Sequence, residues 1–194
     1  MSGSFAGAES RAALDFAALL KGRRTIHEFT PEAVPEAPVL EALELACWVP
    51  NHHRTEPWRF YLLGEVARAR VIDLNTELVR ASKGDAAAEA KRRRWNAMSG
   101  WLVLTCQLHE DSAREREDYA ACCCAAQNLA LGLWSQGIGL KWGTGKVIRT
   151  PGFLDIIGAD PKQEFAVGLF WYGYPAEVPQ QARRPVRELT RIVA

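Results

Sequence analysis

The stretch ACWVPNHHRTEPWRFYLLG, residues 46–64, marks the change from a helix to a strand in this chain. Pro50 favours an end to the apolar helical pattern before it, because the residue that precedes a proline is disfavoured in the α region. The run after Pro57 has the aromatic and apolar character of a strand. Between the two prolines lies a polar loop with an asparagine, two histidines and an arginine, beside Trp48 and Trp58. Polar groups on an apolar rim indicate a binding site for a planar ligand with polar edges.

The size and charge of the chain limit the classes of protein to which it can belong. Its 194 residues are predicted to form one domain, residues 1–194, which buries roughly two thirds of its unfolded surface. The 24 lysines and arginines nearly balance the 23 aspartates and glutamates, so no footprint for nucleic acid or a membrane surface stands out. No stretch is apolar over the length of a bilayer. The partner is therefore predicted to be a small molecule.

The cysteines and the N-terminus indicate a cytoplasmic protein. The five cysteines are Cys47, Cys106, Cys122, Cys123 and Cys124. An odd number with three consecutive members matches neither a disulfide framework nor a metal-binding spacing. Residues 1–10 lack the basic and apolar regions of a secretory signal. Free, buried thiols in a reducing compartment are the prediction.

Hydrophobic periodicity divides the chain into helices and strands. Helices are predicted from Ser10 to about Lys21, over 38–48, from 65 to about 98 with an interruption at 82–85, from 111 or 112 to about 134, and over 150–157 with Thr150 and Pro151 at its start. Strands are predicted at 58–63, 101–108, 138–142 and 164–174, followed by an extended tail over about 176–194. The strands at 101–108 and 164–174 are continuous apolar runs, which indicates burial on both faces.

Two of these helices carry further information. In the helix before Pro50 the side chains predicted to face inward are Leu40, Leu43, Ala46 and Cys47. Residues 119–134 contain only two clearly polar side chains, Gln127 and Asn128, so this segment should be covered on nearly every side. In a chain of this size such coverage indicates a subunit interface.

The triplet Arg23-Arg24-Thr25 follows the first predicted helix and can bind a phosphate group. Guanidinium forks bind phosphate oxygens bidentately, and a hydroxyl adds a further hydrogen bond. The alternative is structural, since the helix dipole favours an arginine just after a helix C-terminus. Arg183 and Arg184 either complete such a phosphate site or are solvated.

Two other polar segments have both a functional and a structural interpretation. Residues 143–145, Gly-Thr-Gly, follow a strand and either present backbone N–H groups to a ligand or form a plain turn. The basic run Lys91–Arg94 is a solvated helix face or a phosphate contact. No metal site is predicted, because adjacent His52 and His53 cannot easily serve one ion. No nucleophile motif occurs, so the chemistry of an enzyme built on this chain would belong to a cofactor.

Five segments fall along the chain in an order that resembles the FMN-dependent nitroreductase family, in particular its compact YdjA-like branch. The matching segments are RRTIHEFTPEAVP (23–35), ACWVPNHHRTEPWRF (46–60), AAQNLALGLWSQGIGLKWGTG (125–145), EFAVGLFWYGYPAE (164–177) and ARRPVREL (182–189). The resemblance extends from about residue 16 to residue 190. No single segment is specific, but five in register are.

The resemblance implies how FMN would be held by its phosphate. Arg23, Arg24 and Thr25 match the segment that binds the FMN phosphate and ribityl chain in the family. Arg183 or Arg184 matches the arginine of the tail that joins the same phosphate. No catalytic side chain is implied.

The resemblance also assigns residues to the isoalloxazine ring. The residues that match the loop lying against the flavin are Trp142, Gly143 and Thr144. Asn51 takes the place of a family serine, His52 matches a residue on the ligand side, and Trp48 matches a position that reaches the flavin of the other subunit. Arg54 and Glu56 depart from the family pattern, which has asparagine and glutamine there.

The fold implied is an α+β, three-layer sandwich in which a mostly antiparallel sheet is flanked by helices, and the assembly is an intertwined homodimer. The activity implied is ping-pong transfer of hydride from NADH or NADPH, through flavin N5, to a nitroaromatic, a quinone or a similar small acceptor. The same residues also fit a protein that stores or senses FMN with little turnover.

Overall fold

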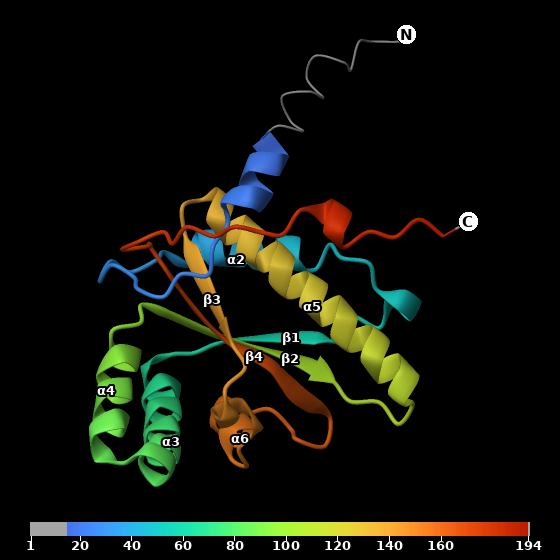
Figure 1. The fold of residues 1–194 in the computed structure, drawn as a ribbon. Helices are drawn as coiled ribbons and strands as arrows, with labels where there is room; N and C mark the ends of the chain where they lie inside the picture. The colour runs from blue at the N-terminus through green and yellow to red at the C-terminus, as the bar shows by residue number, and fades with distance from the viewer. Residues whose placement is uncertain (1–14, 194) are drawn as a thin grey trace.

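The computed structural model describes residues 15–193, at whose centre lies a four-stranded sheet with the order β1-β2-β4-β3 (Figure 1). The strands are β1 (Trp58–Leu62), β2 (Gly100–Gln107), β3 (Gly139–Gly143) and β4 (Glu164–Gly173). Every neighbouring pair is antiparallel. The four strands predicted from the sequence are therefore confirmed, with ends that differ by about one residue.

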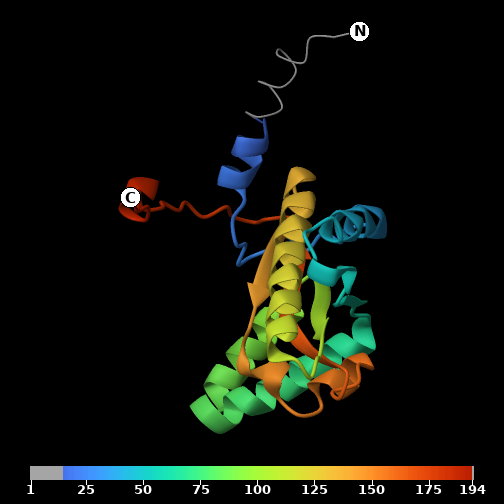
Figure 2. The same cartoon turned by 90° about the vertical axis from the view of Figure 1, so that its right-hand side faces the viewer.

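Helices cover both faces of this sheet (Figures 1 and 2). One face carries α2 (Glu36–Ala46) and α5 (Ser112–Ser135), and the other carries α3 (Glu65–Lys83), α4 (Asp85–Asn96) and α6 (Phe153–Ile157). Short 3₁₀ helices lie at η1 (His52–Arg54), η2 (Lys146–Arg149) and η3 (Val186–Glu188). The predicted α+β, three-layer sandwich is confirmed.

The central strand β2 shows why both faces are buried. Trp101 and Val103 belong to the core under α3 and α4, whereas Leu102, Leu104 and Cys106 belong to the core under α2 and α5. All five side chains are almost fully buried. Because side chains alternate between the faces of a strand, a strand covered on both sides must be apolar throughout.

Helix α2 approaches α5 closely through small side chains. The buried residues of α2 are Val39, Ala42 and Ala46, and a Cβ added at Gly132 of α5 would lie 3.2 Å from the Cα and Cβ of Ala42. The prediction that Leu40 and Cys47 face inward is wrong, since Leu40 is half exposed and Cys47 is exposed. The physical reason is that contact through alanines turns the larger side chains away from α5.

The remaining helix predictions agree in part with the structure. The break at 82–85 is confirmed, because α3 ends and α4 begins at Gly84. Thr150 and Pro151 do not start α6; its N-cap is Gly152, and the Thr150 hydroxyl donates instead to the Lys146 carbonyl. Residues 15–22 are helical, but the predicted start at Ser10 lies outside the described residues.

Two whole-chain predictions can also be compared with the structure. All five cysteines are free thiols, although Cys47 and Cys124 are exposed rather than buried. Within residues 15–193, no helix combines the length and the apolar character needed to cross a membrane.

Candidate functional site

The edge strand β3 brings together two candidate segments that are far apart in the sequence. Thr25 forms an isolated parallel bridge with Leu140, and the Ile26 N–H donates to the Leu140 carbonyl at 3.2 Å. The chain continues along β3 from Leu140 to Thr144, four residues further on. In an extended strand this separation corresponds to roughly 13 Å. The arginines before Thr25 and the loop around Thr144 therefore lie along one edge of the sheet.

Three guanidinium groups gather at the start of this edge. Burial, followed by the positive charges of Arg183 and Arg24, lowers the pKa of Arg23. The Nε atoms of Arg23 and Arg24 are buried and have no hydrogen-bond partner. Within residues 15–193, none of these arginines forms an ion pair with a carboxylate. Arg23 and Arg24 are partly buried and Arg183 is exposed, and positive charges gathered in this way without an acidic partner favour the binding of an anion.

Arg24 also has the structural role that was the alternative to phosphate binding for residues 23–25. Its Nη1 donates to the carbonyl of Lys21 at 2.5 Å and to that of Arg23 at 2.9 Å. Lys21 lies in the last turn of the N-terminal helix, where carbonyl groups lack partners. Arg24 thus caps a helix while its Nε stays unpaired.

Trp142 is held in a fixed position at the other end of the edge. Its ring stacks on Phe170 with centroids 5.4 Å apart, and its Nε1 donates to the Val167 carbonyl at 3.2 Å. Val167 is the extra residue of a bulge in β4, since Leu104 pairs with Gly168 and Thr105 with Ala166. The extra residue of a bulge is left out of the hydrogen bonding between the strands. Here the Val167 carbonyl accepts from the indole N–H of Trp142 instead.

Gly168 leaves the space that the indole occupies, which gives a testable prediction. A Cβ at residue 168 would lie 2.1 Å from Trp142 Nε1, so Gly168→Ala is expected to displace the ring and to lower the free energy of unfolding by about 1–3 kcal/mol. Urea denaturation measures this loss. The matched control is Gly64→Ala, where nothing lies within 4 Å of the added Cβ. Equal stability of the two variants would contradict a fixed Trp142.

The loop after Pro50 has an unusual backbone. His53, Arg54 and Glu56 have φ values of 62°, 53° and 45°, a region that non-glycine residues adopt at a cost of about 1–3 kcal/mol each. Asn51 stabilises this turn, because its Oδ1 accepts from the Glu56 N–H at 2.7 Å and its Nδ2 donates to Thr55 Oγ1 at 2.9 Å. Such strained loops persist only where surrounding contacts fix them.

The contact that fixes this loop is a buried carboxylate of α5. Asp118 is 1% exposed. Its Oδ1 accepts from Thr55 Oγ1 at 2.5 Å and from Asn51 Nδ2 at 3.4 Å, and its Oδ2 lies 2.7 Å from His109 Nε2. The network therefore joins the loop, the N-terminal part of α5 and the segment after β2.

Of the residues predicted to meet the flavin from this region, Trp48 and His52 are on the surface, whereas Asn51 is partly buried. Trp48 is 80% exposed, and the exposed rings of His52 and His53 lie with centroids 3.9 Å apart. The turn at His53 also brings one donor atom of each histidine and of the exposed Glu117 within 4.8 Å of one another. The sequence analysis did not anticipate this grouping.

Within the single chain, the loop and the arginine cluster do not lie together. The arginine cluster adjoins the C-terminal end of α5, where a Cβ at Gly22 would lie 3.4 Å from Trp134. The loop adjoins Asp118, sixteen positions earlier on the same helix, which corresponds to roughly 24 Å. Figure 1 shows η1 and the N-terminal helix toward opposite ends of α5.

Comparison with known proteins identifies the family. A model of the Nitroreductase family matches residues 20–174. The chain belongs to the nitroreductase family. The Bacillus subtilis protein YfhC, named provisionally as an NAD(P)H nitroreductase, is 34% identical to this nitroreductase over 175 residues, which cover 88% of this chain and 90% of YfhC.

Solved structures show the same fold. A nitroreductase-like family protein from Bacillus cereus superposes with a TM-score of 0.81 at 30% identity, covering 100% of this chain and 98% of its own. The FMN-dependent nitroreductase NfnB from Mycobacterium smegmatis, solved with NADPH, superposes with a TM-score of 0.74 at 18% identity, covering 94% and 100%. At the latter identity the likeness concerns the fold alone.

Sequence reasoning missed two groups of residues in this nitroreductase. The first is the Asp118 network, whose signal was a charged residue directly before the apolar part of α5. The second is a set of lysines and tryptophans from α3, α4, β3, η2 and β4 that line one cavity. Nothing in the local sequence could have identified the second group, because its members belong to separate elements.

Proposed function

We propose that this nitroreductase binds FMN and uses it to pass hydride from NADH or NADPH to a small acceptor. The observation that carries the proposal is the cluster of Arg23, Arg24 and Arg183, which has buried, unpaired Nε atoms and no carboxylate partner within residues 15–193. A dianionic phosphate would neutralise this cluster and accept charge-assisted hydrogen bonds from its guanidinium groups. The names of YfhC and NfnB support the same cofactor and donor.

The residues along β3 fit the rest of the cofactor. Thr25 is held at the edge of the sheet by its bridge to Leu140, where its hydroxyl would bind the ribityl chain. Trp142, Gly143 and Thr144 would lie against the ring system. When bound, FMN accepts hydride at N5 and returns it to an acceptor, so the protein supplies position, electrostatics and exclusion of water without an essential acid or base.

We also propose that the active unit is a homodimer. Large apolar side chains are exposed on the N-terminal helix, on and just after α2, and on the C-terminal tail, namely Phe16, Leu20, Leu40, Leu45, Trp48, Val186, Leu189, Ile192 and Val193. Figure 2 shows this tail extending beyond the body of the sandwich. A dimer would cover these side chains, and it would place Trp48, Asn51 and His52 against the FMN of the partner. Light scattering in solution tests this assembly.

The function is tested by the spectrum and the reduction of the purified protein. We expect a yellow protein whose flavin absorbance is lost within seconds when NADH or NADPH is mixed with it anaerobically in a stopped-flow instrument, and returns on addition of a nitroaromatic or a quinone. A protein that binds no FMN contradicts the proposal. Bound FMN that neither nicotinamide reduces would instead indicate storage or sensing.

The five free thiols also agree with a reducing, cytoplasmic location, which we propose as part of the same function.

A further inference from the structure

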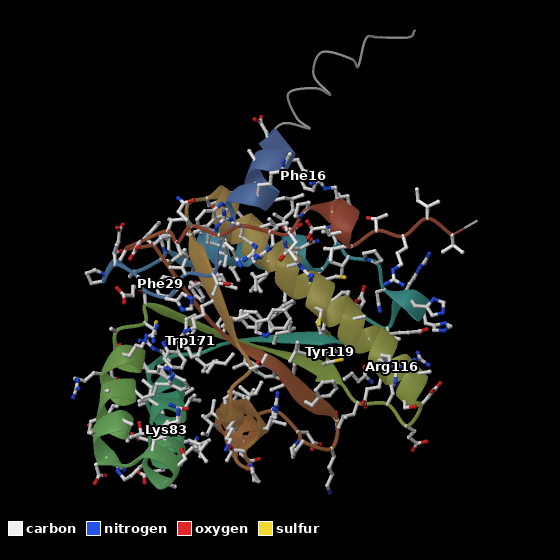
Figure 3. The ribbon with its side chains drawn as sticks, in the orientation of Figure 1. Phe16, Phe29, Lys83, Arg116, Tyr119 and Trp171 are labelled. Carbon is white, nitrogen blue, oxygen red and sulfur yellow. The ribbon has the colours of Figure 1, made fainter. Side chains whose placement is uncertain are left out.

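Two adjacent histidines and a glutamate gather where η1 contacts α5. One donor atom from each of His52, His53 and Glu117 lies within 4.8 Å of the other two. Figure 3 labels Arg116, the residue before Glu117, near the N-terminal end of α5, and Figure 1 shows η1 beside that end. Two imidazoles and a carboxylate are a donor set that divalent transition-metal ions, zinc among them, bind in proteins.

The backbone of His53 brings the two histidine rings together. Successive side chains diverge around a helix and alternate across a strand, so adjacent residues of a regular element do not share an ion easily. His53 instead has φ of 62° and ψ of 2°. Its ring centroid lies 3.9 Å from that of His52, with 47° between the ring planes. The left-handed turn therefore removes the geometric obstacle that adjacent histidines normally present.

The turn is held by α5, the helix that also supplies the carboxylate. Thr55 Oγ1 donates to Asp118 Oδ1 at 2.5 Å, and the Glu56 N–H donates to Asn51 Oδ1 at 2.7 Å. Glu117 directly precedes Asp118, so one turn of α5 both anchors the loop and provides the third donor. Donors that are positioned before binding lose less conformational freedom when they take up an ion.

The three donor side chains are available to an ion. All three are exposed. Within residues 15–193 neither histidine nor Glu117 forms an ion pair, and none of the three side chains makes a hydrogen bond. Donors around a tetrahedral zinc ion lie roughly 3.3 Å apart, given bonds of about 2.0–2.1 Å. Exposed side chains reach that spacing by small rotations.

We propose that His52, His53 and Glu117 bind one divalent transition-metal ion of the zinc type, which clamps the loop to α5. The ion offsets part of the cost of the left-handed backbone, because its binding free energy also stabilises the fold that forms the site. Three protein donors leave one tetrahedral position for water. An imidazole has two nitrogens, so His52 can bind the ion through one and still present its ring to the FMN of a partner. The inference goes beyond the proposed function and does not depend on it.

Calorimetric titration with zinc chloride tests the site, in protein that carries no affinity tag and has been treated with EDTA and then dialysed. Wild-type protein is expected to bind one zinc ion per chain at this site. His52→Ala, His53→Ala and Glu117→Gln each remove one donor and are expected to raise the zinc Kd at least about tenfold. Zinc should also raise the thermal midpoint of the wild type, because it binds the folded state, and this rise should be lost in the three variants.

Two control variants separate this site from other surface donors. His27→Gln removes an exposed histidine that stands beside Glu28 and lies outside the cluster, so it should bind zinc as the wild type does. Cys47→Ser combined with Cys124→Ser removes the two exposed thiols, which also attract zinc. Equal zinc affinity of the wild type and the His52 variant, or a loss confined to the thiol variant, overturns the inference. Circular dichroism and urea midpoints without zinc check that each variant is folded.

Discussion

Replacing Arg23 by alanine is expected to weaken FMN binding about 10- to 100-fold and to leave riboflavin binding unchanged. Hydrogen bonds to charged groups contribute about 1.5–3 kcal/mol each, and riboflavin has no phosphate to lose them. Arg23 stands beside Arg24 and Arg183 with a buried, unpaired Nε. Fluorescence titration of the apoprotein with the two flavins measures the effect.

Three further variants sharpen this experiment. Arg183→Ala and Arg184→Ala decide which arginine of the tail joins the phosphate; we expect the larger loss for Arg183, whose charge contributes to lowering the pKa of Arg23. Arg70→Ala, an exposed arginine of α3, is the control and should bind both flavins as the wild type does. An equal loss of FMN and riboflavin in the Arg23 variant would show that Arg23 is structural.

The second large effect concerns stability. Asp118→Ala is expected to lower the free energy of unfolding by about 2–4 kcal/mol, because it removes the buried carboxylate that accepts from the Thr55 hydroxyl and the Asn51 amide and that faces His109. The positive φ angles of the loop would lose the contact that fixes them. Urea denaturation at one fixed protein concentration measures the change, because an oligomer gains stability with concentration.

A nearby residue of the same helix provides the control for Asp118. Arg116 is exposed on α5 and forms no ion pair among residues 15–193, so Arg116→Ala should change stability by no more than about 0.5 kcal/mol. If Asp118→Ala costs as little as this control, the carboxylate does not anchor the loop.

The sequence by itself determined the order and type of the elements. Apolar periodicity predicted the four strands, the break at Gly84 and the long helix α5, because period and capping depend on residues only a few positions apart. The continuous apolar run of β2 also indicated that helices cover both faces of the sheet. Five short segments in register then indicated the family.

The tertiary structure alone decided which side chains meet. The bridge from Thr25 to Leu140, the bonds from Asp118 to the loop at Asn51, and the four lysines around one cavity each join residues far apart in the sequence. The inward face of α2 was predicted wrongly for the same reason: periodicity shows that a helix has a buried side, but the partner at Gly132 selects the alanines that form it. Local pattern depends on neighbours along the chain, whereas a binding site depends on how the packed elements bring distant residues together.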